Sequence, residues 1–97
     1  MLDSTPPLPD LRLLVGPGDH AALLGACAHT DALGRAATCL VYVAVHRRAE
    51  VWTRVYRVVP DRRPGHLMVY IEKALAGDAI TAATAWARER FGLNSPA

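Results

Sequence analysis

The sequence has no apolar run that approaches the roughly 20 residues a membrane-spanning helix needs. Its first ten residues include three prolines and lack the basic and apolar segments of a secretory signal. We expect residues 1–10 to be a disordered tail and residues 11–97 to form one domain, since a chain this short builds a single hydrophobic core. A cytoplasmic location, with no membrane partner, is the expectation that follows.

Cysteine is scarce, with only Cys27 and Cys39 in the chain. Two cysteines are too few for a disulfide framework, and a reducing compartment would keep both as thiols. The cysteines and the four histidines form no Cys-x2-Cys or His-x3-His pair, which is the usual spacing of a zinc site. We therefore expect no metal and no other cofactor.

Lysine is rarer still: Lys73 stands alone beside ten arginines, a usage that, with the abundant alanine, is typical of a GC-rich bacterial genome. Residues 46–63 hold six arginines and two acidic residues, so this segment carries a net charge of +4. The whole chain carries only +2, which leaves the remainder negative. The positive charge is therefore concentrated in one segment.

The first half of the domain has a mixed pattern. Residues 11–15 form a short apolar run before a Gly-Pro-Gly turn and predict a strand. Asp19 precedes an alanine-rich segment and resembles an N-cap, so residues 20–29 predict a helix that ends near Gly34.

The second half begins with a β-hairpin. Residues 40–45 and 51–59 are rich in β-branched and aromatic side chains, and the polar residues 46–50 join them. Residues 67–71 are apolar on both faces, as in a covered or central strand, with a helix over residues 66–76 as the alternative.

Residues 79–91 form the clearest helix pattern, and Gly92 is well placed to end it. Gly77 and Asp78 mark the break before this helix, with Asp78 as a second candidate N-cap. The predicted fold is α+β, a small, mainly antiparallel sheet of three to four strands with two helices on one face. The predicted order is β-α-β-β-β-α.

The arginine-bearing hairpin is the first candidate site, because arginine binds phosphate bidentately and stacks on bases. Its candidate contacts to RNA or DNA are Arg47, Arg48, Arg54, Arg57, Arg62 and Arg63. The competing interpretation is that strand alternation separates Arg54 from Arg57 and that arginine only solubilises an exposed sheet.

Two further functions remain open. A small ribonuclease-like enzyme would use histidines and arginines near the hairpin, with His46 and His66 as the first to test. An assembly protein would use the last helix to form a homodimer or bind a partner, through Trp86, Arg90 and Phe91. The sequence favours a non-enzymatic bacterial binding module that acts as a homodimer, and RNA or DNA is its expected charged ligand.

Overall fold

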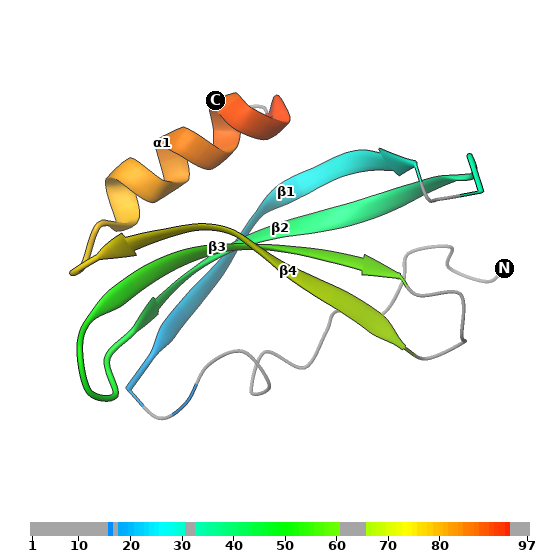
Figure 1. Cartoon of the computed structure of the whole chain (residues 1–97). Coiled ribbons are helices and arrows are strands. Elements are labelled where there is room, and N and C mark those ends of the chain that lie inside the picture. Colours follow the sequence, from blue (N-terminus) through cyan, green and yellow to red (C-terminus); the bar gives the residue numbers. More distant parts are fainter. Residues whose placement is uncertain (1–15, 17, 31–32, 61–65, 94–97) are drawn as a thin grey trace, which may run out of the picture.

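The computed structural model describes residues 16, 18–30, 33–60 and 66–93, and shows a four-stranded sheet covered on one face by a helix (Figure 1). Consecutive strands pair antiparallel in the order β1-β2-β3-β4, so β1 and β4 are the edge strands. The elements, in chain order, are β1 (His20–Thr30), β2 (Ala36–His46), β3 (Trp52–Pro60), β4 (Leu67–Ala76) and α1 (Ile80–Phe91). The fold is therefore α+β, as expected.

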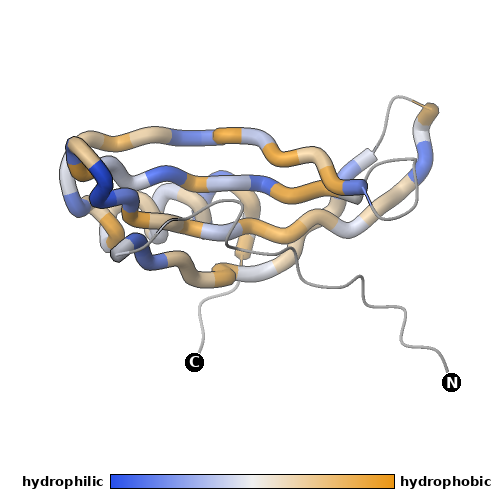
Figure 2. Tube along the Cα trace, turned by 90° about the horizontal axis from the view of Figure 1, so that it is seen from below, coloured by the Kyte–Doolittle hydropathy of each residue, from blue (hydrophilic) through white to orange (hydrophobic). Residues whose placement is uncertain are grey.

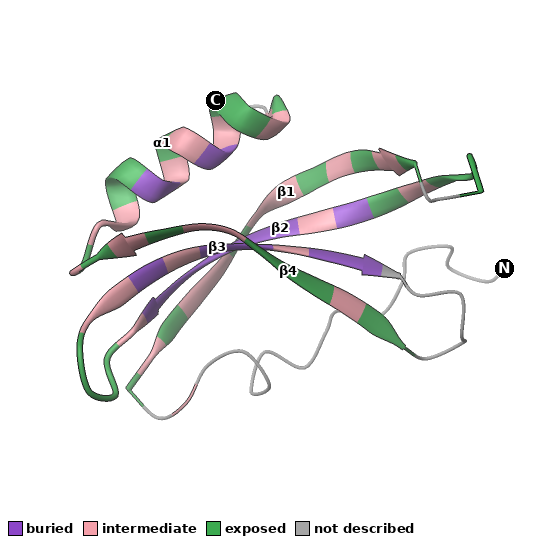
Figure 3. Cartoon of the chain, viewed as in Figure 1, coloured by how far each residue is buried: buried purple, intermediate pink, exposed green. Residues whose placement is uncertain are grey.

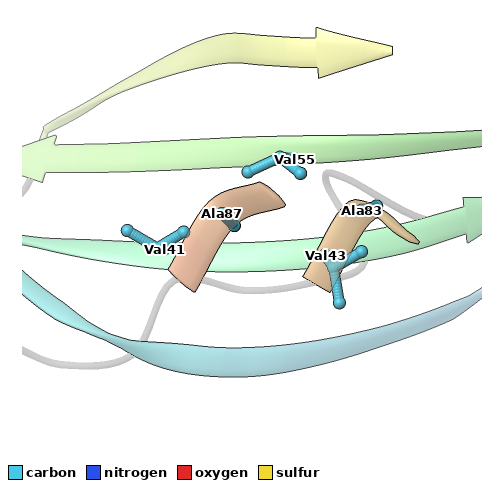
Figure 4. Close-up of a cluster of buried hydrophobic side chains, with 5 residues drawn as sticks. All are labelled: Val41, Val43, Val55, Ala83 and Ala87. Atoms are coloured by element: carbon cyan, nitrogen blue, oxygen red, sulfur yellow. The ribbon is translucent and has the colours of Figure 1, made fainter. Parts of the chain in front are cut away.

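The hydrophobic core lies between α1 and the central strands. Val41 and Val43 of β2 and Val55 of β3 contact Ala83 and Ala87 of the helix, and each of the five is at most 1% exposed (Figure 4). The small alanine side chains let the helix approach the sheet closely. We call the face of the sheet that α1 covers the helix face, and the opposite one the far face.

The far face of the central strands is buried as well. Tyr42 and Ala44 of β2 form a second cluster with Tyr56 and Val58 of β3. Burial on both faces explains the continuous apolar run of β2, which an antiparallel strand with one wet face would not need. Figure 3 shows the contrast between these buried central strands and the largely exposed first half of β4.

Thr53 fixes the start of α1. Its buried hydroxyl donates to the carbonyl of Gly77 and accepts from the N–H of Ala79, both at 2.8 Å. The N-cap is Ala79, which has no side-chain cap, so the prediction of Asp78 as N-cap is wrong. At the other end, Gly92 is left-handed (φ 64°) and ends the helix as predicted.

The predicted helix over residues 20–29 is wrong, because this segment is strand β1, paired with β2 from His20↔Val45 to Thr30↔Ala36. Helix propensity is a weak preference that tertiary pairing overrides. Gly25 lies at a bulge in β1, where an added Cβ would come within 3.3 Å of Leu93. Asp19 is consequently not an N-cap, and the described residues hold one helix instead of two.

The other predictions of local structure fare better. The hairpin is confirmed, although β2 begins earlier, at Ala36. Of the segment left open between strand and helix, Leu67–Ala76 is a strand. The predicted tail (residues 1–10) and first strand (residues 11–15) lie outside the described residues. No helix in the described part of the chain has the length and apolarity to cross a membrane.

A disulfide joins Cys27 to Cys39, which corrects the expectation of two thiols. The two residues face each other directly across β1 and β2, with their Cα atoms 5.4 Å apart. That spacing lies within the usual range for a disulfide, so the pairing of the strands brings the sulfurs together. The bond ties the edge strand β1 covalently to the buried strand β2.

We predict that reduction of this disulfide destabilises the fold. The cysteines are 12 residues apart, and closing a loop of that size lowers the entropy of the unfolded chain by an amount worth about 3 kcal/mol. Denaturant unfolding with and without dithiothreitol measures the difference. A Cys27→Ala, Cys39→Ala double variant is the control and should not respond to the reductant. Equal stability of the oxidised and reduced wild type would contradict the prediction.

Candidate functional site

The structure does not bring the hairpin arginines onto one surface. Arg54 pairs with Ala44 on the far face, whereas Arg57 pairs with Val41 on the helix face. Arg47 and Arg48 are exposed in the turn between β2 and β3, and Arg62 and Arg63 lie outside the described residues.

Two of these arginines are already paired with acids. The Arg57 Nε atom donates to Glu72 at 2.8 Å, its Nη1 contacts His29 Nδ1 at 3.0 Å, and its guanidinium lies 4.7 Å from the Tyr70 ring centre. Arg47 pairs with Asp78 at the start of α1. Nucleic-acid binding by the hairpin stays a prediction, and of its described strand arginines, Arg54 and Arg57 lie on opposite faces.

A hydrogen-bonded chain of Asp19, His46 and Tyr56 connects the residue before β1 with β2 and β3. His46 Nδ1 lies 3.1 Å from Asp19 Oδ2, and His46 Nε2 lies 2.7 Å from the Tyr56 hydroxyl. Since a carboxylate only accepts, Nδ1 carries the proton in the neutral ring, and the Tyr56 hydroxyl donates to Nε2. Both ring nitrogens of His46 are thus occupied by the protein itself.

Asp19 is the anchor of this chain. Its carboxylate also accepts the backbone N–H groups of Gly16 at 2.8 Å and Arg47 at 2.7 Å. These two hydrogen bonds, together with His46, lower the pKa of Asp19 from 3.8 to about 2. The carboxylate that the sequence assigns to a helix cap instead fastens the start of β1 to the turn after β2.

This geometry argues against a ribonuclease built on His46 and His66. His46 is opposite Trp52, the first residue of β3. His66 precedes Leu67, which is opposite Pro60, the last residue of β3. Eight strand steps separate these points, which is about 26 Å. The described residues also hold no group of three or more His, Cys, Asp or Glu side chains suited to a metal ion.

The residues proposed for a helix interface lie against the chain's own core. Trp86 and Phe91 pack on the cluster between helix and sheet, and their rings meet edge to face at 6.2 Å. Lys73 of β4 lies 5.5 Å from the centre of the Trp86 ring. Arg90 is exposed and stacks on Phe91. This placement favours the intramolecular role for the two aromatic residues.

The first half of β4 is the largest apolar feature left uncovered in the described part of the chain. Leu67, Val69 and Ile71 are 40%, 44% and 57% exposed, and Tyr70 is 39% exposed. Val69 and Ile71 pair with Val58 and Tyr56, which places them on the far face. Figure 2 shows the hydrophobic colouring of this half of the edge strand.

The prediction of a covered or central strand for residues 67–71 is therefore wrong, since β4 is an edge. A strand that is apolar on both faces normally needs cover on both faces. The described residues provide this strand with one hydrogen-bonded neighbour, β3. The apolar pattern was visible in the sequence, and the missing information was the position of the strand in the sheet.

Comparison with known protein families, curated proteins and solved structures finds no match to this chain.

We predict that Asp19→Asn destabilises the protein at neutral pH. The folded-state pKa of Asp19 lies below its usual value, so the carboxylate's contribution is complete above about pH 4 and is lost as the pH falls through about 2. The deficit of the variant should therefore shrink across that window in denaturant unfolding. Asp78→Asn, which removes an exposed ion pair, is the matched control and should change stability by about 0–1 kcal/mol. A deficit that is the same at pH 2 and at neutral pH would refute the assignment.

A second prediction compares two buried tyrosines that face each other across β2 and β3. The Tyr56 hydroxyl bonds to His46, whereas the Tyr42 hydroxyl is buried without a partner, and its burial raises the pKa of Tyr42. Tyr56→Phe should cost about 1 kcal/mol of unfolding free energy, and Tyr42→Phe should be neutral or stabilising. Thermal or denaturant unfolding of both variants tests this, and the reverse order of stability would disprove it.

Proposed function

We propose that this chain is a non-enzymatic interaction module that binds an extended polypeptide segment along the edge of β4. The observation that carries the proposal is the exposed apolar run of residues 67–71 on an edge strand. An edge strand presents unpaired backbone N–H and C=O groups, and a second polypeptide binds by completing their hydrogen bonds. The exposed side chains would add apolar contact to that pairing.

The character of the edge supports this proposal. Soluble proteins protect their edge strands with charge, proline or short length. Residues 67–71 contain neither charge nor proline, and β4 is 10 residues long. The charged residues Glu72 and Lys73 come after this run, and both are engaged within the chain, with Arg57 and with Trp86.

The other edge offers a weaker surface. In β1, Leu23 is the only large apolar residue that is more than about a third exposed, at 48%. Most of the strand is alanine, glycine and other small residues, which bury little area on binding. We therefore assign the interaction to β4 and use β1 as the internal reference.

The test is the binding of a labelled peptide with the sequence of residues 66–76, followed by fluorescence anisotropy. We expect the folded protein to bind this peptide and Ile71→Lys to weaken binding at least about tenfold, which corresponds to about 1.4 kcal/mol. A lysine at this position places a charge on the apolar edge.

Leu23→Lys makes the same chemical change on the opposite edge and should leave peptide binding unaltered. Absence of binding to the wild type at concentrations where it is monomeric, or equal loss in both variants, would contradict the proposal.

A further inference from the structure

We infer that the partner of the β4 edge is a second copy of this chain, paired antiparallel about Val69. The inference rests on the proposed function of that edge and adds the identity and register of the partner. It follows from the order of residues along the strand and from the alternation of its two faces.

The faces of the sheet limit the possible registers. In a symmetric pair of identical strands, residue i of one copy faces residue j of the other, and the sum of i and j is the same for every pair. Side chains that face each other across two paired strands lie on the same face of the sheet, and faces alternate along a strand. The residue numbers i and j are therefore both odd or both even, and their sum is even. The centre of the pairing therefore falls on a residue.

Only the register centred on Val69 matches the apolar run with itself. It places Leu67 opposite the partner's Ile71, Val69 opposite the partner's Val69, and Met68 opposite the partner's Tyr70. A centre at Met68 would put Tyr70 opposite the partner's His66. A centre at Tyr70 would put Leu67 and Met68 opposite the partner's Lys73 and Glu72. Both alternatives bring apolar side chains against polar or charged ones.

The residues that flank the run are complementary in the same register. His66 faces the partner's Glu72, and the symmetry gives this pair twice. His66 is exposed, and Arg57 holds Glu72 in place through the 2.8 Å hydrogen bond to its carboxylate. An imidazole opposite a carboxylate is favourable, whereas like charges directly opposite destabilise a sheet. Glu72 is also the bulged residue of β4, so regular pairing ends there.

The resulting dimer would have a continuous eight-stranded sheet. Because paired strands keep their faces continuous, both copies of α1 would lie on the same side of it. On the opposite side, Leu67, Val69 and Ile71 of both copies would form one apolar cluster that crosses the twofold axis. The exposed apolar side chains of each copy would contact those of the other across the axis.

Single cysteine substitutions in the intact chain test the register. Facing residues of paired strands have Cβ atoms about 4.5–5.5 Å apart, close enough for a disulfide after small adjustment. Val69→Cys should form a covalent dimer under mild oxidation, seen as a doubled mass on a non-reducing gel. Met68→Cys and Tyr70→Cys report the two neighbouring registers and should form at least about tenfold less dimer alone, but should cross-link when mixed. The native cysteines are bonded to each other and leave the added thiol as the reactive one.

Leu23→Cys on the outer β1 strand is the control for random collision and should not cross-link. Sedimentation of the wild-type chain should give the mass of a dimer, and this measurement does not depend on the folding of any variant. The Ile71→Lys variant should sediment with the mass of a monomer. If Met68→Cys or Tyr70→Cys, each incubated without the other, formed more covalent dimer than Val69→Cys, the register would be wrong. A monomeric wild type at all concentrations would overturn self-pairing. If the β4 peptide still bound to such a monomer, strand addition would stand with a different partner; if it did not, both proposals would fail.

Discussion

A single 12-residue helix cannot cover one whole face of a four-stranded sheet, and this limit shapes the molecule. A helix with its side chains is about 10–12 Å wide, whereas four strands spaced about 4.8 Å apart span about 14 Å between their outer axes. Here α1 packs mainly on β1, β2 and β3, so the valines of β2 and β3 receive the cover. On the helix face, Tyr70 of β4 lies beyond that cover and is 39% exposed. Leu67, Val69 and Ile71 lie on the far face, away from α1, and are exposed there.

The two edges of the sheet are held in different ways. The strand β1 is fastened by the Cys27–Cys39 disulfide and by the Asp19 carboxylate, which joins its start to the turn after β2. In the strand β4, the Arg57 guanidinium lies over Tyr70 and pairs with Glu72, and Lys73 lies over Trp86. Residues 67–71 pair with β3, and their outer edge has no strand partner among the described residues. The second half of β4 is thus held by contacts within the chain, whereas residues 67–71 are suited to pairing with a second polypeptide.

Much of the local structure was predictable because its signals are local. The β-branched run of residues 40–45 and the terminal glycine at 92 each specify their conformation through steric preference. The error at β1 arose because alanine-rich sequence is compatible with a helix, and its strand pairing depends on β2. Cys27 and Cys39 face each other across β1 and β2, a pairing that follows from the strand register and not from their spacing in the sequence. The contact of Asp19 with His46 joins residues 27 apart and follows only from the correct strand order.

Amide hydrogen exchange reports whether the β4 edge is paired with a second copy in solution. The outward-pointing amides of residues 67–71 have no strand partner within the described chain. The outward-pointing amides of the other edge strand, β1, have none there either. Self-pairing at this edge predicts that the β4 amides are protected in concentrated solution and lose protection on dilution, while the outer β1 amides exchange rapidly throughout. Equally rapid exchange at both edges at every concentration would contradict it.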